Sequence, residues 1–132
     1  MTDPATSLPP PLRVLVVDAD DRIRESLAGL LKIGGRCAVV GSAGGPDDAI
    51  AKAAAMHPDV VLIDPRLPAL AGGLAFIACL REAAPGVRVL VFNGSDAPES
   101  PSSDGADAHI KKTFRQHELI DAVVAAARTT VA

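Results

Sequence analysis

Short apolar runs alternate along the chain with longer stretches whose apolar residues recur at helical spacing. Each run is short enough to be a strand that is buried on both faces. The runs are residues 13–17, 38–40, 60–63, 87–92 and 108–110. Between the first two runs, Ile23, Leu27 and Leu31 repeat at the spacing of one helix face. Strands that alternate with helices predict an α/β fold, in which helices cover both faces of a parallel sheet.

Glycine and proline set the expected ends of these elements. The first helix should stop at Gly34-Gly35, and the second should begin at Pro46 and end near His57, before Pro58. The glycine-rich residues 41–45 are expected to form a loop before that second helix. Later helices are predicted at 74–81 and at about 115–128.

Three of the predicted strands end in charged residues. The first runs into Asp18, Asp20 and Asp21, the third into Asp64, and the last into Lys112. In open α/β sheets ligands bind at the carboxyl ends of the strands, so these charges are candidates for one site. A simpler interpretation of Asp64 alone is that it caps a loop or a helix start.

The chemistry of such a site follows from its charges. Clustered carboxylates repel one another unless a cation neutralises them, and Mg²⁺ accepts one or two carboxylates together with phosphoryl oxygens. Lys112 would add a positive charge able to hold another phosphoryl oxygen. This combination suits the formation and breakdown of an acyl phosphate on a carboxylate nucleophile.

These motifs resemble the receiver domain of bacterial two-component response regulators. Residues 16–24 are similar to the acidic opening of that family, and residues 60–68 to its phosphorylation strand, with Gly72 behind it. The turn 105–107 and Lys112 match the end of the family pattern. The resemblance implies a doubly wound, CheY-like sheet of five parallel strands in the order 2-1-3-4-5. It covers a single domain at 12–128, between a flexible Pro-rich N-terminal tail, 1–11, and a C-terminal tail, 129–132.

The resemblance also implies a role for individual residues. Asp64 would be the phospho-acceptor, served by a histidine kinase or a phosphotransfer protein. Asp18, Asp64 and the backbone carbonyl of Arg66 would hold Mg²⁺. Lys112 and Asn93 would bind the phosphoryl group. Asn93 and His109 would form the switch that responds to it.

Several positions depart from the family pattern. Ala19 stands where a second acidic residue usually binds the metal, which should weaken Mg²⁺ binding, and Asp20 could substitute only if the loop adjusts. Asn93 replaces a Thr or Ser, His109 a Tyr or Phe, and Thr113 a Pro. The Pro- and Ser-rich segment 95–104 stands where the family has the helix between its fourth and fifth strands. That helix is therefore expected to be shortened or missing.

Composition limits the possible functions. The formal net charge is −3 and there is no basic run, which argues against nucleic-acid binding. No apolar run reaches membrane-spanning length, and there is no signal-peptide pattern, so a cytoplasmic location without membrane contact is expected. Cys37 and Cys79 lack metal-ligand spacing and are predicted to be reduced, structural thiols, with Cys79 in the core.

The function expected from the sequence is therefore signalling and not enzymatic catalysis. The leading hypothesis is a stand-alone receiver protein in a phosphorelay that contacts a downstream protein partner. Because Ala19 and the 95–104 segment weaken the switch, an alternative is a pseudo-receiver, a binding module that Asp phosphorylation does not regulate. A third hypothesis is a small flavodoxin-like, cofactor-binding enzyme, which the acidic loop after the first strand disfavours.

Overall fold

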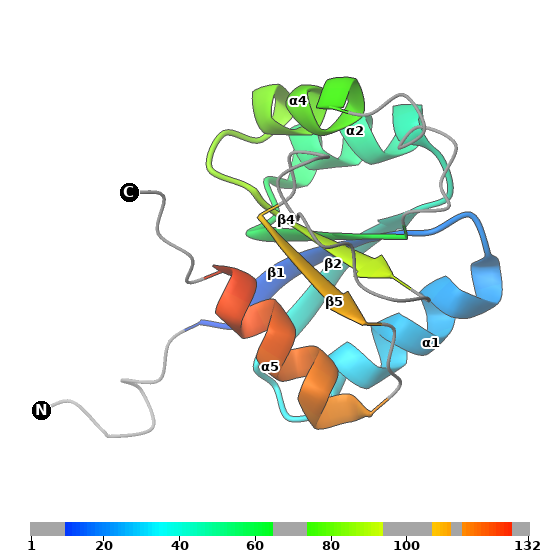
Figure 1. The fold of residues 1–132 in the computed structure, drawn as a ribbon, viewed down its shortest axis with the longest axis vertical. Coiled ribbons are helices and arrows are strands. Elements are labelled where there is room, and N and C mark those ends of the chain that lie inside the picture. The colour runs from blue at the N-terminus through cyan, green and yellow to red at the C-terminus, as the bar shows by residue number, and fades with distance from the viewer. Residues whose placement is uncertain (1–9, 65–73, 94–106, 112–114, 128–132) are drawn as a thin grey trace, which may run out of the picture.

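The computed structural model describes residues 10–64, 74–93, 107–111 and 115–127. Its centre is one parallel sheet in the order β2-β1-β3-β4-β5, which confirms the predicted topology (Figure 1). The strands are β1 (Leu12–Val17), β2 (Cys37–Ala43), β3 (Val60–Ile63), β4 (Arg88–Asn93) and β5 (Ala108–Lys111).

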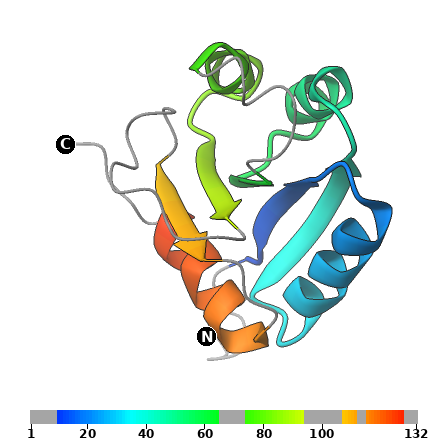
Figure 2. The same cartoon turned by 45° about the vertical axis from the view of Figure 1, so that its right-hand side comes forward.

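Helices cover both faces of this sheet, as the alternating pattern predicts. They are α1 (Asp21–Lys32), α2 (Pro46–Met56), α4 (Leu74–Ala83) and α5 (Gln116–Ala127). Helices α1 and α5 lie on one face, and α2 and α4 lie on the other (Figure 2). None of these helices is long and apolar enough to cross a membrane within the described part of the chain.

Each face of the sheet has its own apolar core. Side chains alternate along β1, so Val14 and Val16 pack toward α1 and α5, while Leu15 and Val17 pack toward α2 and α4. The strand β3 is completely buried along its length, as expected for a central parallel strand. The core is therefore continuous up to the last residue of β3, and Asp64 follows directly.

The second strand is longer than its sequence suggests. It was expected at 38–40 but extends to Ala43, so Gly41 and Ser42 belong to β2 and not to a glycine-rich loop. Pairing with the long β1 overrides the low strand propensity of glycine. A Cβ on Gly41 would lie 2.9 Å from the Met56 sulfur, so a larger residue there would have to displace the Met56 side chain.

The prediction that Cys79 belongs to the core is wrong. Cys37 is buried, but Cys79 is exposed. Helix α4 buries Phe76, Ile77 and Leu80, and a residue two positions after Ile77 lies on the opposite side of a helix. The 95–104 segment, most of the predicted N-terminal tail and the C-terminal tail lie outside the described residues.

Candidate functional site

Two aspartates directly follow neighbouring strands at the carboxyl edge of the sheet. Val17 and Ile63 are register partners in β1 and β3, and Asp18 and Asp64 are the next residues of the two strands. The Asp64 N–H donates to the Val17 carbonyl at 3.0 Å, so the two segments remain paired there. Both side chains are buried, with 2% exposure for Asp18 and 4% for Asp64. The structure thus places Asp18 and Asp64 at the ends of two adjacent strands.

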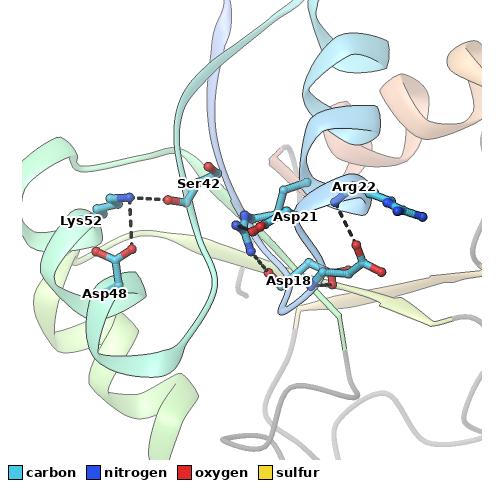
Figure 3. A network of polar contacts seen from close by, with 8 residues as sticks. Asp18, Asp21, Arg22, Ser42, Asp48 and Lys52 are labelled. Carbon is cyan, nitrogen blue, oxygen red and sulfur yellow. Dashed lines mark hydrogen bonds and ion pairs between the residues drawn. The ribbon is translucent and has the colours of Figure 1, made fainter.

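The turn after Asp18 is ordered by its own carboxylates. The Asp20 N–H donates to Asp18 Oδ1 at 2.8 Å, and Asp20 Oδ1 accepts from the Arg22 N–H, also at 2.8 Å. The second bond makes Asp20 the N-cap of α1. Figure 3 shows Asp18, Asp21 and Arg22 together where this helix begins. In this structure the exposed Asp20 side chain caps a helix.

Arg24 is a site residue that the sequence analysis did not identify. Its Nη1 donates to the Asp18 carbonyl oxygen at 2.6 Å, and its Nη2 pairs with the Asp21 carboxylate. The side chain is only 19% exposed. The spacing of Asp21 and Arg24, three residues apart on a helix, was the available signal.

A second basic side chain, Lys52, lies on α2 and reaches the end of β2. Lys52 on α2 forms an ion pair with Asp48 at 3.1 Å, and its ammonium also donates to the Ser42 carbonyl oxygen. Figure 3 shows Lys52 between Asp48 and Ser42, apart from Asp18. The hydrogen bond from Lys52 to Ser42 therefore connects α2 with the end of β2.

Asp107, directly before β5, forms hydrogen bonds with β4 and α4. Its carboxylate accepts from the Val89 N–H at 2.7 Å and from Arg81 Nη2 at 3.2 Å, while its own N–H donates to the Val89 carbonyl at 2.9 Å. A single side chain thus joins β4, β5 and α4. This contact fixes the start of the strand that leads toward Lys112.

The remaining predicted residues are placed only through their backbone, or not at all. Asn93 is the last residue of β4, at the same edge of the sheet as Asp64, and pairs with Lys111. His109 lies within β5 and pairs with Val91. Arg66 and Lys112 lie outside the described residues. Their roles remain predictions.

The donors at this edge fit Mg²⁺. Asp18 and Asp64 supply buried carboxylates from the ends of two adjacent strands. Mg²⁺ is commonly held by one or two carboxylates, with water completing its coordination shell. Within the described ranges, no group of three or more His, Cys, Asp or Glu side chains is arranged to hold a metal. Ala19 is exposed and contributes no ligand, so Asp18 and Asp64 are the ligand candidates of these two strand ends.

Comparison with known proteins agrees with this geometry. The family model described as the response regulator receiver domain matches residues 14–124. The chain is 28% identical over 116 residues to the transcriptional regulatory protein LnrK of Bacillus subtilis, covering 86% of this chain and 52% of LnrK. It is 33% identical over 126 residues to the transcriptional regulatory protein PdtaR of Mycobacterium tuberculosis, covering 93% of this chain and 61% of PdtaR. The chain therefore spans little more than half the length of these relatives.

A solved structure extends the likeness to three dimensions. The signal receiver domain of the response regulator NarL from Mycobacterium tuberculosis superposes with a TM-score of 0.78 at 30% identity. The superposition covers 92% of this chain and all of that domain.

Proposed function

Because the chain belongs to the response regulator receiver domain family of two-component signalling, we propose that Asp64 accepts a phosphoryl group from a histidine kinase or a phosphotransfer protein. The observation that carries this proposal is the position of Asp64 beside Asp18, both buried, at the carboxyl ends of the adjacent strands β1 and β3. The donor protein would bind at this edge. A downstream protein partner would then distinguish the phosphorylated from the unphosphorylated domain.

The reaction follows from the chemistry of a carboxylate. An Asp64 oxygen attacks phosphorus, the bond from phosphorus to the donor nitrogen breaks, and an acyl phosphate forms on the aspartate. The backbone pairing of β1 with β3, which includes the hydrogen bond from the Asp64 N–H to the Val17 carbonyl, holds Asp64 in place before attack. The burial of Asp64 limits access of bulk water to the product.

Receiver domains generally bind Mg²⁺ for phosphorylation, and the proposed ligands here are Asp18, Asp64 and the Arg66 carbonyl. When bound, the ion would neutralise charge that develops on the phosphoryl oxygens. Lys112 and Asn93 are proposed to hold the phosphoryl group, and Asn93 and His109 to respond to it. Asp20 Oδ1 accepts from the Arg22 N–H and caps α1, so Asp20 could serve Mg²⁺ through its other oxygen or by giving up the cap.

The test is phosphorylation by acetyl phosphate, with and without Mg²⁺, followed by intact mass. The wild-type chain should gain one phosphoryl group only with Mg²⁺, and Asp64→Asn should gain none because the amide is not a nucleophile. Asp47→Asn is the matched control, since Asp47 is an exposed aspartate in the first turn of α2 and follows the edge strand β2, not β1 or β3. It should be phosphorylated as the wild type is.

A pseudo-receiver is the competing function, and the absence of a carboxylate at Ala19 favours it. The use of Asp20 as a helix cap points the same way, because one oxygen of its carboxylate already accepts from the Arg22 N–H. A wild-type chain that gains no phosphoryl group at any Mg²⁺ concentration would support this alternative. Phosphorylation of Asp64→Asn at the wild-type rate would instead show that another residue is the acceptor.

A further inference from the structure

The guanidinium of Arg24 joins the two loops that follow β1 and β2. It donates to the Asp18 carbonyl oxygen at 2.6 Å and pairs with Asp21, so both ends of the acidic turn are bound by one planar group. The helix backbone is fixed at the same place, because the Arg24 N–H donates to the Asp20 carbonyl at 3.1 Å. Arg24 therefore contacts the turn from its side chain and from its backbone.

Gly44 provides the space in which this guanidinium lies. A Cβ built on Gly44 would be 2.8 Å from Arg24 Nη1 and 3.5 Å from Arg24 Cζ. The Gly44 backbone does not have a positive φ, so the chain conformation would accept alanine, but its Cβ would push the Arg24 guanidinium aside. The neighbouring Gly45 has open space around its Cβ position. The close approach is thus specific to Gly44.

We propose that Arg24 is a positioning residue for the Asp18 carboxylate, which would bind the metal, and that Gly44 leaves the space that the Arg24 guanidinium occupies. By holding the Asp18 carbonyl, Arg24 fixes the turn in which Asp18 Oδ1 accepts the Asp20 N–H. The Asp18 carboxylate is then held in one orientation at the end of β1. This inference rests on the proposed function, because it assigns Asp18 to Mg²⁺ binding.

The experiment compares Arg24→Gln, Gly44→Ala and the double variant, with Gly45→Ala as the matched control. The first readout is hydrogen exchange of the Asp20 amide, which does not depend on phosphorylation. Arg24→Gln and Gly44→Ala should each accelerate this exchange about tenfold, the size expected for loss of a hydrogen bond to a charged group. Gly45→Ala should leave it unchanged. Adding Gly44→Ala to Arg24→Gln should have no further effect, since the shorter side chain leaves the space empty.

The second readout is the Mg²⁺ concentration that gives half the maximal rate of acetyl phosphate transfer. Both single variants should raise it about tenfold, as loss of an orienting contact does at metal sites, and saturating Mg²⁺ should restore the rate. General destabilisation is checked separately by urea unfolding of each variant, because Mg²⁺ binding also favours the folded state of a destabilised protein. Arg24→Lys should recover only part of the affinity, because an ammonium cannot reproduce the two-pronged contact.

The outcomes separate the two proposals. Unchanged exchange at Asp20 in Arg24→Gln, or additive effects in the double variant, would overturn the role of Arg24 and Gly44. So would a rate that stays low in the variants at saturating Mg²⁺. If the wild type is not phosphorylated but exchange is accelerated in both single variants, the proposed function is overturned. The contact between Arg24 and Gly44, and its effect on the Asp18 turn, would still stand.

Discussion

Helices α1 and α2 flank the same pair of strands but are built differently. Helix α1 buries Leu27 and Leu31, whereas α2 buries Ala49 and Ala53. Helix α1 begins with a side-chain cap from Asp20, while α2 begins at Gly45 with no side-chain cap and relies on Pro46. The small residues on α2 let it lie close to the sheet.

This difference shows how the candidate site is coupled to the fold. The cap of α1, the Asp18 carboxylate and Arg24 belong to one hydrogen-bonded turn, so a change at the start of α1 also changes the site. The ends of α2 contact neither Asp18 nor Asp64 through the bonds described above. We therefore expect α1 to respond to substitution in both stability and metal affinity, and α2 in stability alone.

The largest expected effect is the loss of a large core side chain from α1. Leu31 is fully buried, so Leu31→Ala should lower the free energy of unfolding by about 3 kcal/mol through lost burial and a cavity. The comparison variant on α2 is Ala53→Gly, which removes one buried methyl group and should lower it by about 1 kcal/mol. Urea unfolding measures both. Equal losses would contradict the unequal packing of the two helices.

The start of α1 should show a smaller effect with two readouts. Asp20→Ala removes the acceptor of the Arg22 N–H and should lower the free energy of unfolding by about 1 kcal/mol. Asp20→Asn keeps an oxygen acceptor for the Arg22 N–H, so its free energy of unfolding should stay at the wild-type value. Any change in its Mg²⁺ affinity would then come from the lost negative charge. A loss of Mg²⁺ affinity in Asp20→Asn at unchanged stability would make Asp20 a ligand.

These two regions also show what the sequence could predict. The strands, the helices and the positions of Asp18 and Asp64 at strand ends followed from apolar periodicity and from charges, which are local signals, whereas the strand order followed from the resemblance to the receiver family. The length of β2 did not, because Gly41 and Ser42 are held in the sheet by pairing with β1. The close approach of Arg24, in α1, to Gly44, after β2, was missed for the same reason, since the two residues are distant in sequence.

The end of α2 should gain stability when its strain is removed. His57 ends this helix in the left-handed region, with φ of 47° and ψ of 63°, where a Cβ is unfavourable. His57→Gly should raise the free energy of unfolding by about 0.5 kcal/mol, because relief of strain exceeds the added flexibility of the unfolded chain. His57→Ala keeps the Cβ and should give no gain. Thermal unfolding of the three proteins is the measurement.

The start of α2 should gain still less. Gly45 has extended φ and ψ and open space around its Cβ position, so Gly45→Ser can provide the missing side-chain cap. The expected gain is about 0.3 kcal/mol, because glycine is already tolerated at this position. Gly45→Ala offers no acceptor and should not stabilise the helix. An increase in Mg²⁺ affinity in Gly45→Ser would contradict the independence of α2 from the site.

The smallest effect concerns the core beneath α1, which holds the buried thiol of Cys37, whereas the described core beneath α2 and α4 holds no cysteine. Burial raises the pKa of the Cys37 thiol above its ordinary value of 9.0, and the nearby Arg36 partly offsets this. Well below pH 9.0 the thiol is protonated in both states, so it adds no pH dependence to stability there. Above that value the unfolded chain loses its proton first, and the free energy of unfolding should fall as pH rises. Urea unfolding of wild type and Cys37→Ala between neutral and alkaline pH measures this difference, and parallel pH profiles for the two proteins would contradict it.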